Sequence, residues 1–279
     1  MIDVLLATYR PDAQMLKAQV DSIRAQQGVD VNLICREDTE GLGAAGNFSA
    51  LLAQSEAAYV AFSDQDDVWL PEKLSKAMAR MAELEEKYGK DVPLLVFTDG
   101  YVTDATLTRQ PGTIVSRQGV RVNAALRFSR LLMQNFVPGN AMLFNAALRA
   151  RAGAVPPEAL MHDVWMLLVA AAFGHVAFVD EPLFDYRQHG ANAVGATRAG
   201  TGHFLRRLGE GRRAFRERLM RNVRMAEAFV RRFGDAAPEP ARALAGFGRM
   251  GAWSRRRALI RHRLFKCGVL RNLALLLFA

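Results

Sequence analysis

The stretch AYVAFSDQDDVW, residues 58–69, decides the fold and marks the candidate site. Its first half is an apolar, β-prone run that predicts a buried strand ending at Asp64. Asp64, Asp66 and Asp67 then place three carboxylates within four positions, where they repel one another unless a cation neutralises them. A hard divalent ion such as Mg²⁺ or Mn²⁺ suits such oxygen ligands, and a solvated acidic loop is the plainer alternative.

The segments on either side alternate between predicted strands and predicted helices. Residues 2–8, 31–35 and 93–98 are apolar, β-prone runs. Asp12 can cap a helix after the first strand, with Leu16, Val20 and Ile23 as its inner stripe, and Pro71 fits position N1 of a helix over residues 72–88. This alternation predicts an α/β fold with a parallel sheet.

Acidic residues follow three of these strands. Glu37 and Asp38 follow the second strand, Asp64 the third, and Asp99 the strand over residues 93–98. Ligands of parallel α/β sheets bind at the carboxyl ends of the strands, so we expect these side chains to converge on one edge.

The composition is that of a globular protein. The chain has 279 residues, of which 51% are hydrophobic and 23% charged. Its two cysteines, Cys35 and Cys267, are too few and too far apart for a disulfide framework or a zinc cluster, which favours a reducing cytoplasm. The N-terminus lacks a basic leader and a long apolar stretch, so it does not resemble a signal peptide.

The charge is distributed very unevenly along the chain. Residues 201–279 contain 19 Lys or Arg against 5 Asp or Glu, whereas residues 1–200 carry a net charge of −5 within a total of +9. We therefore expect an acidic domain over 1–200 and a basic helical region over 201–279, with an anionic partner for the latter.

Three interpretations of the basic region remain open. Phe204–Phe233 has the pattern of a long amphipathic helix, and the final apolar run Leu273–Ala279 is far shorter than the ~20 residues that span a membrane. Basic amphipathic helices suit an anionic bilayer surface, which is the prediction made here. A helical hairpin packed on the catalytic domain is the second interpretation. Nucleic-acid binding is the third and is not expected, because no nucleic-acid motif accompanies the aromatic residues.

Several motifs, in order and spacing, resemble one enzyme family. VLLATYRP, CREDT, GLGAAGNFSALL and FSDQDDVWLPEKL in the first half, then NFVPGNAMLFN, MHDVWMLLVAAAFG and EPLFDYRQHGANAVG, are similar to family 2 glycosyltransferases, with the rhamnosyltransferase-like branch nearest. The resemblance covers roughly residues 2–195. It implies a GT-A fold, with a Rossmann-like, mostly parallel sheet flanked by helices, a nucleotide-sugar half over about 1–100 and an acceptor half over about 101–200.

The resemblance also implies a nucleotide-sugar and metal site. Glu37 stands where the family usually has aspartate, which leaves open whether it or Asp38 contacts the base. The residues implied in nucleotide-sugar binding are Thr8, Tyr9, Glu37, Asp38, Asn47, Asp64, Asp67, Asp99 and Arg187. Asp66 and His189 are the implied ligands of Mn²⁺ or Mg²⁺.

On the acceptor side the resemblance assigns Asp163 as the general base. An ionised carboxylate is favoured at a helix N-terminus, and a base must reach the proton that it removes. A plain N-cap role for Asp163 is the alternative. The implied acceptor and sugar pocket contains Trp69, Asn135, Gly139, Asn140, His162 and Trp165, although Trp69 favours packing over contact with sugar.

The sequence as a whole predicts a metal-dependent inverting glycosyltransferase. The expected donor is a dTDP- or UDP-sugar, with dTDP-rhamnose preferred, and the expected acceptor is a hydroxyl of a surface polysaccharide or a lipid-linked glycan. We expect a cytoplasmic protein held peripherally on the inner face of the membrane. A non-catalytic membrane-associated or nucleic-acid-binding protein that keeps a GT-A shell is the alternative, and the sequence does not indicate an oligomeric state.

Overall fold

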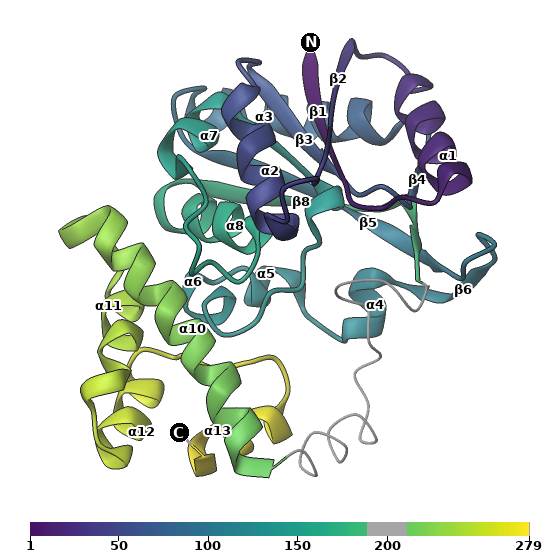
Figure 1. The fold of residues 1–279 in the computed structure, drawn as a ribbon. Helices are drawn as coiled ribbons and strands as arrows, with labels where there is room; N and C mark the ends of the chain where they lie inside the picture. Colours follow the sequence, from purple (N-terminus) through teal and green to yellow (C-terminus); the bar gives the residue numbers. More distant parts are fainter. Residues whose placement is uncertain (189–210, 279) are drawn as a thin grey trace. The chain divides into compact units, whose positions relative to one another are not determined.

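The computed structural model describes residues 1–188 and 211–278 of the chain (Figure 1). These residues divide into two compact units. The first unit comprises Met1–Gly119, Val137–Val155 and residues 161–188, and the second comprises Val120–Phe136, Pro156–Leu160 and residues 211–278. A single domain boundary near residue 200 remains a prediction.

The first unit is built on one mixed sheet, which confirms the α/β fold class. The described strands run in the order β2-β1-β3-β7-β5-β8-β4, and β6 pairs with β5. They are β1 (Ile2–Thr8), β2 (Val31–Glu37), β3 (Tyr59–Ser63), β4 (Val68–Trp69), β5 (Leu94–Thr103), β6 (Arg109–Thr113), β7 (Met142–Asn145) and β8 (His175–Arg187).

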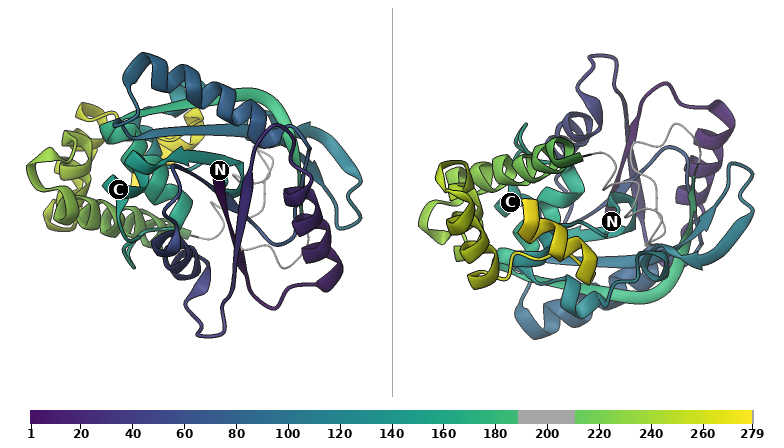
Figure 2. Two further views of the ribbon diagram at one scale, coloured as in Figure 1. Left: turned by 90° about the horizontal axis from the view of Figure 1, so that it is seen from above. Right: turned by 90° about the horizontal axis from the view of Figure 1, so that it is seen from below.

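The long strand pairings are parallel and the short ones are antiparallel. β1 pairs in parallel with β2 and β3, and β5 pairs in parallel with β8. The short strand β7 lies antiparallel between β3 and β5, an insertion that simple strand–helix alternation does not predict. β8 runs as a long curved strand along the unit (Figure 2). The sheet is thus mostly parallel by length and mixed by strand order.

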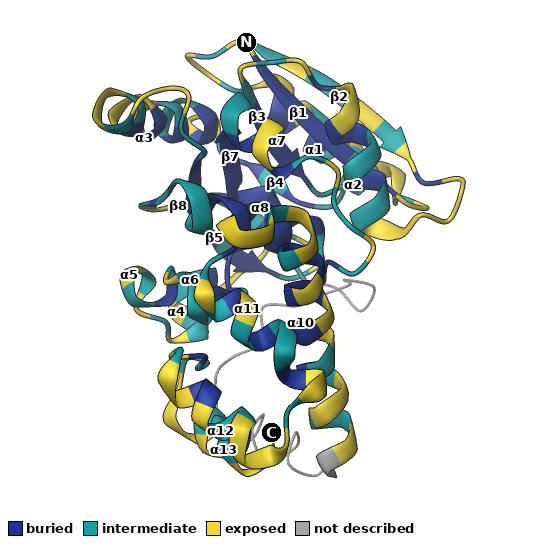
Figure 3. Ribbon diagram, turned by 90° about the vertical axis from the view of Figure 1, so that its left-hand side faces the viewer, coloured by how far each residue is buried: buried dark blue, intermediate teal, exposed yellow. Residues whose placement is uncertain are grey.

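Helices cover the sheet of the first unit. α2 packs on β1 and β2 and beside α8, and α3 packs on β5 and β8. The helical segments are α1 (Ala13–Arg24), α2 (Gly43–Gln54), α3 (Lys73–Tyr88), α4 (Ile114–Gln118), α7 (Ala146–Ala152), α8 (His162–Phe173) and the 3-10 turn η1 (Gly139–Ala141). Figure 3 colours most of β1 and β3 as buried, and the core of this unit lies there.

Three local expectations need correction. The strand expected over residues 93–98 continues to Thr103, because a bulge at Thr98 and Asp99 shifts its register against β8 and pairing then resumes. Pro71 does not occupy N1, since α3 begins at Lys73. Asp12 does cap α1, but Gln19 and Ser22 are buried beside Ile23, whereas Leu16 and Val20 are not fully buried.

The described part of the second unit is helical. Its elements are α5 (Val122–Ala125), α6 (Phe128–Leu131), α10 (Gly211–Phe233), η2 (Gly234–Ala236), α11 (Glu239–Ala245), η3 (Gly246–Arg249), α12 (Ala252–Arg261) and α13 (Val269–Phe278). The amphipathic helix expected from residue 204 is confirmed over 211–233, and the positions before 211 lie outside the described residues. Within 1–188 and 211–278, no helix combines the length and apolar character needed to cross a bilayer.

Asn145 joins four backbone groups at the end of β7. Its Oδ1 accepts from the N–H groups of Leu94 and Leu148, each at 3.0 Å. Its Nδ2 donates to the carbonyls of Lys90 and Val92, at 3.1 and 2.9 Å. One buried side chain therefore caps α7 and fixes the start of β5.

We expect Asn145→Ala to lower the free energy of unfolding by about 2–4 kcal/mol, because buried backbone groups lose their partner. Asn32, which is exposed and makes one bond to Asp3 at 2.9 Å, is the matched control. Asn32→Ala should cost less than about 1 kcal/mol. Urea titrations of both variants check this, and equal effects would contradict the role given to Asn145.

Candidate active site

The acidic residues of the motif lie at the carboxyl end of β3, as expected. Asp64 and Asp66 are partly exposed, whereas Asp67 is fully buried. Burial, and then the nearby charges of Asp66 and Asp163, raise the pKa of Asp64 to about 7. The fold therefore brings Asp163, in the first turn of α8, close enough for its charge to act on Asp64.

Asp67 is a buried carboxylate with a structural set of partners. Its Oδ1 accepts from the backbone N–H of Arg187 at 2.9 Å, and its Oδ2 accepts from Nδ2 of Asn140. Burial, and then the charges of Asp64 and Asp66, hold its pKa well above the usual range. Asp67 thus ties the motif to β8 and η1 instead of facing solvent.

Arg187 also serves this loop. Its Nε donates to the backbone carbonyl of Asp66 at 2.6 Å, and its Nη1 donates to the carbonyl of Ala105. The side chain is buried, so in this structure its guanidinium holds the backbone near the motif.

The sequence analysis missed a polar network that fixes the same loop from the other side. Gln19 donates to the Ser63 hydroxyl at 2.7 Å, and the Ser22 hydroxyl accepts from the Trp69 backbone N–H at 3.0 Å. Gln65 pairs with both the N–H and the carbonyl of Tyr9, at 2.7 and 3.2 Å. The available signal was the position of Gln19 four residues before Ile23, on the inner face of α1.

Lys73 is a second residue that the sequence analysis missed. It is 1% exposed, and its Nζ lies 3.6 Å from the centroid of the Trp69 ring. Burial lowers its pKa to about 7, while the charge of Asp67 acts in the opposite direction. Its spacing of four residues from Ala77, within the buried stripe of α3, was the available signal.

At the end of β2 the structure separates the roles of two acidic residues. The Asp38 carboxylate accepts from the N–H groups of Leu42 and Gly43, at 2.9 and 2.7 Å, and its pKa is lowered by these bonds. Asp38 therefore fixes the start of α2, whereas Glu37 is exposed.

Three further donor-side residues border these strand ends. The Asn47 amide donates to the carbonyls of Thr8 and Arg36, at 3.3 and 3.1 Å, so it holds the ends of β1 and β2 together. Thr8 is buried, and the ring of Tyr9 is 55% exposed. Tyr9 is thus the aromatic side chain that this edge offers to a ligand.

Asp99 lies within β5 and fixes the backbone beyond it. It is buried and accepts from the N–H groups of Gly100 and Val115, at 2.8 and 3.2 Å. These bonds connect the β5 bulge to the start of α4.

Asp163 is not the N-cap of α8. Met161 occupies the N-cap position without a side-chain hydrogen bond, which leaves Asp163 in the first turn. Its Oδ1 accepts from the Val164 N–H at 2.6 Å, and its side chain is largely buried. A carboxylate in the first turn of a helix is stabilised as an anion by the helix dipole.

His162 packs as a neutral ring. It stacks on Phe48, with a ring-centroid distance of 3.8 Å, and meets Phe62 edge-on. Burial lowers its pKa to about 3, and neither ring nitrogen has a hydrogen-bond partner in the described part of the chain. A Cβ at Gly139 would approach Nε2 of His162 to 2.7 Å, so this turn requires glycine.

Four predicted site residues remain, of which two lie in the core, one in the second unit and one outside the described residues. Trp69 and Trp165 are buried, and the Trp165 indole donates to the Ala152 carbonyl at 3.2 Å, so both tryptophans pack inside the protein. Asn135 belongs to the second unit. His189 lies outside the described residues.

The donor set suits a hard divalent cation. Asp64 and Asp66 offer oxygen ligands and repel one another, Asp163 adds to this repulsion, and a cation would relieve it. Among residues 1–188 and 211–278, no group of three or more His, Cys, Asp or Glu side chains is arranged to hold a metal. The fit therefore rests on chemistry and charge.

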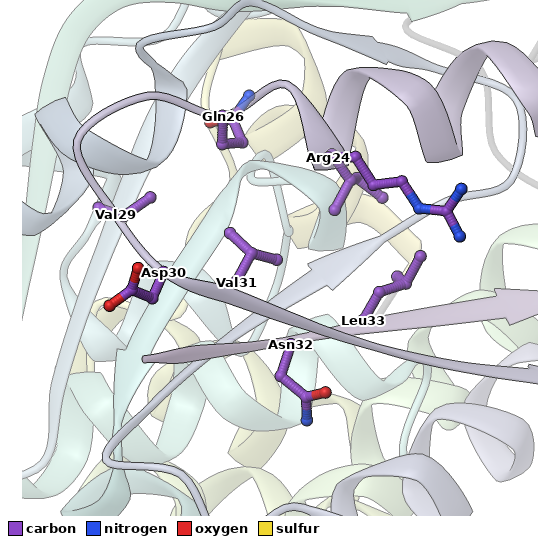
Figure 4. A pocket seen from close by; sticks show the side chains of 8 residues that line it. Arg24, Gln26, Val29, Asp30, Val31, Asn32 and Leu33 are labelled. Carbon is purple, nitrogen blue, oxygen red and sulfur yellow. The ribbon is translucent and has the colours of Figure 1, made fainter.

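A pocket elsewhere in the first unit is unrelated to these residues (Figure 4). It is lined by Ile23, Arg24 and Gln26 near the end of α1 and by residues 29–33 at the start of β2. The acidic residues lie at the opposite ends of the parallel strands. This pocket is not the candidate active site.

We expect Asp67→Ala to lower the free energy of unfolding by about 2–3 kcal/mol, because the Arg187 N–H and the Asn140 amide lose their acceptor. Asp67→Asn should cost less than about 1 kcal/mol, since it removes a buried charge and Asn140 can turn its unpartnered Oδ1 toward the new amide. Chemical denaturation measures both. Loss of nucleotide binding at unchanged stability in both variants would instead assign Asp67 to the ligand.

The family model described as glycosyl transferase family 2 matches residues 11–149. A search of curated proteins finds no match.

Solved structures of similar fold include S. aureus TarS 1-349. Its complex with UDP has a TM-score of 0.53 at 13% identity, covering 95% of this chain and 72% of that chain. Its complex with UDP-GlcNAc has a TM-score of 0.50 at 14% identity, covering 94% and 80%. A further TarS 1-349 structure matches 67% of this chain and 60% of its own length. These likenesses concern the fold. Residues 11–149, which include the acidic motif, match the model of glycosyl transferase family 2.

Proposed function

We propose that the chain transfers a sugar from a nucleotide-diphosphate donor to an acceptor hydroxyl, with inversion at the anomeric carbon. The observation that carries the proposal is the meeting of two distant segments. Asp163 of α8 lies close enough to Asp64 for its charge to raise the pKa of that carboxyl, although about a hundred positions separate them in sequence. A donor-binding carboxylate and a candidate base thus share one region of the first unit.

On the donor side, we assign recognition of the base to Glu37. Both Asp38 oxygens are occupied by the N–H groups at the start of α2, whereas Glu37 is exposed at the end of β2. The exposed ring of Tyr9, whose backbone N–H and carbonyl are held by Gln65, offers a surface on which a nucleobase can stack.

Asp66, with His189 as the family resemblance implies, would hold Mn²⁺ or Mg²⁺. When bound, the cation would neutralise charge on the diphosphate leaving group. The buried Asp67 and Arg187 keep the loop that carries Asp66 in place. Asp67 accepts from the backbone N–H of Arg187, and the Arg187 guanidinium donates to the Asp66 carbonyl.

The acceptor side needs one base and no enzyme nucleophile. The acceptor oxygen attacks the anomeric carbon as the bond from that carbon to the diphosphate oxygen breaks, and the hydroxyl proton passes to the Asp163 carboxylate. The position of Asp163 in the first turn of α8 favours an anion through the helix dipole. Gly139 of η1 lies beside this group, since a Cβ there would come within 3.5 Å of the Asp163 Cβ, and Asn140 of the same turn binds Asp67.

The donor and acceptor are proposed from the family resemblance. It favours dTDP-rhamnose, while UDP and UDP-GlcNAc are the ligands of TarS in the complexes of similar fold. We propose a surface polysaccharide or a lipid-linked glycan as acceptor, which would place the enzyme at the inner face of the membrane. A panel of nucleotide sugars with purified protein and Mn²⁺ tests the transfer itself. If no sugar of the panel is either hydrolysed or transferred, the result counts against the proposal.

We expect Asp66→Ala to abolish Mn²⁺-supported binding of dTDP or UDP while the fold persists. The hydrogen bond from Arg187 goes to the Asp66 backbone carbonyl, which alanine retains. Isothermal titration calorimetry with and without Mn²⁺ measures this, with the exposed Asp91→Ala as the control. Unchanged Mn²⁺-supported binding in Asp66→Ala would remove Asp66 from the metal site.

We expect Asp163→Asn to lower kcat by ~10²–10⁴-fold, the usual contribution of a general base. The donor Kd should stay within about threefold of the wild-type value, because the donor side is untouched. Asparagine keeps the shape and an oxygen that can accept from Val164, so the thermal midpoint should change little. The exposed Asp180→Asn serves as a matched carboxylate control. A near-normal kcat in Asp163→Asn would exclude Asp163 as the base.

A further inference from the structure

Exposed large apolar side chains are concentrated in two helices of the second unit. Across the described residues, six of the nine such side chains lie on α12 and α13, namely Trp253, Ile260, Val269, Leu270, Leu273 and Leu277. The other three, Met1, Tyr9 and Leu42, are scattered in the first unit. Scattered apolar residues are normal on protein surfaces, whereas a concentration indicates an interaction surface.

Each of the two helices has a buried side and an exposed side. On α13, Val269, Leu273 and Leu277 recur every four residues and are 75%, 52% and 65% exposed, while Ala274 and Leu275 are buried. On α12, Trp253 and Ile260 are exposed, whereas Ala258 and Leu259 are buried. Figure 3 shows exposed and intermediate residues over much of both helices. We call these six exposed side chains the α12–α13 face.

The α12–α13 face is held together by one arginine. Arg256 of α12 donates through Nε to the Leu276 carbonyl at 2.7 Å and through Nη2 to the Leu277 carbonyl at 3.3 Å. It thereby satisfies backbone groups at the end of α13, and its guanidinium lies 5.7 Å from the centroid of the Trp253 ring. The exposed stripes therefore belong to two connected helices.

The long helix α10 does not provide a comparable apolar surface. Its stripe of Leu219, Val223, Ala226 and Phe229 is buried. Asn222 on the same side donates to the carbonyls of Leu132 and Met133, and Phe229 contacts Phe128 at a centroid distance of 5.5 Å. α10 therefore packs within the second unit through its apolar stripe. Its exposed arginines add positive charge, but among the described residues of this helix no exposed large apolar side chain accompanies them.

The charge around the α12–α13 face selects its partner. Residues 241–279 contain nine Arg or Lys and no Asp or Glu. Arg257, Arg261 and Arg263 are exposed beside the apolar residues. A second copy would bring two such arginine-rich surfaces together, which like charges oppose. A negatively charged surface with an apolar layer beneath it complements both features.

We propose that the α12–α13 face inserts shallowly into the surface of an anionic lipid bilayer. Leucine and tryptophan side chains would enter the boundary between headgroups and acyl chains, and the arginines would contact lipid phosphates. At 1.5 Å per residue, the ten residues of α13 extend roughly 15 Å, which suits a helix lying in the plane of the interface. This attachment does not depend on sugar transfer and is tested without turnover.

Tryptophan fluorescence gives a direct readout on the full chain. Trp69 and Trp165 are 2% and 0% exposed, whereas Trp253 is 83% exposed. Vesicles of phosphatidylglycerol and phosphatidylcholine at low salt should shift the emission to shorter wavelength, and brominated lipids should quench it. Trp253→Phe should abolish both changes. Binding without any response from Trp253 would overturn insertion by this face.

Vesicle sedimentation with paired variants separates insertion from simple charge attraction. Leu273→Glu/Leu277→Glu and Arg221→Gln/Arg224→Gln each change the net charge by the same amount, but only the first pair alters the α12–α13 face; Arg221 and Arg224 are exposed on α10. We expect the leucine pair to lose on the order of tenfold or more in partitioning, and the arginine pair to lose clearly less. Leu273→Gln/Leu277→Gln should also weaken binding without any charge change.

Equal losses in the two charge-matched pairs would overturn the proposal in favour of non-specific electrostatic attraction. Failure of the wild-type protein to bind anionic vesicles at low salt would also overturn it. Self-association that Leu273→Gln/Leu277→Gln abolishes, without vesicle binding, would assign the face to a second copy. Deleting residues 241–279 is a poorer test, because it also removes buried Phe247 and Leu259.

Discussion

The burial of Asp67 is the constraint on which the architecture of the site depends. A carboxylate without solvent exposure must be satisfied by fixed donors, and here the donors come from β8 and η1. The Asp67 carboxylate thereby joins three segments that are distant in sequence, namely the acidic motif, β8 and η1. Lys73, buried on the Trp69 ring, lies close enough to Asp67 for that carboxylate to raise its pKa against the effect of burial. The hydrogen bonds of Asp67 thus fix the loop that carries the partly exposed Asp64 and Asp66.

A second set of polar contacts makes the same loop rigid from the α1 side. Gln19 and Ser22 replace apolar side chains on the inner face of α1 and bind Ser63 and the Trp69 backbone. Buried polar groups are costly unless they are satisfied, so α1 can pack only in the register that provides these partners. Pre-organisation of this kind favours binding, because the loop that would receive a nucleotide sugar is already ordered.

The two units use arginine in different ways. In the first unit Arg187 is buried, and it binds backbone carbonyls next to the motif. In the second unit, exposed arginines accompany exposed leucines and a tryptophan, while Arg256 binds the carbonyls at the end of α13. The surroundings of each arginine therefore decide its role: the buried Arg187 is structural, whereas the exposed arginines of the second unit can contact an anionic surface.

The sequence by itself determined the local structure and the identity of the acidic motif. Apolar runs located β1, β2 and β3, and Asp12 marked the start of α1. The parallel pairing of β1 with β2 and β3 placed the acidic residues of two strand ends toward one edge. These features follow from periodicity and capping within short windows of sequence, where nearby residues dominate the energetics.

Only the tertiary structure decided which side chains of the motif are buried and which are partly exposed. It inserted β7 antiparallel between β3 and β5, gave Asp38 to the start of α2, turned Arg187 inward and placed both Trp69 and Trp165 in the core. It also brought Asp163 to Asp64, and it buried the stripe of α10 while leaving that of α13 exposed. Each outcome depends on which distant backbone donor or apolar surface contacts a side chain in the folded protein, and no short window of sequence contains that partner.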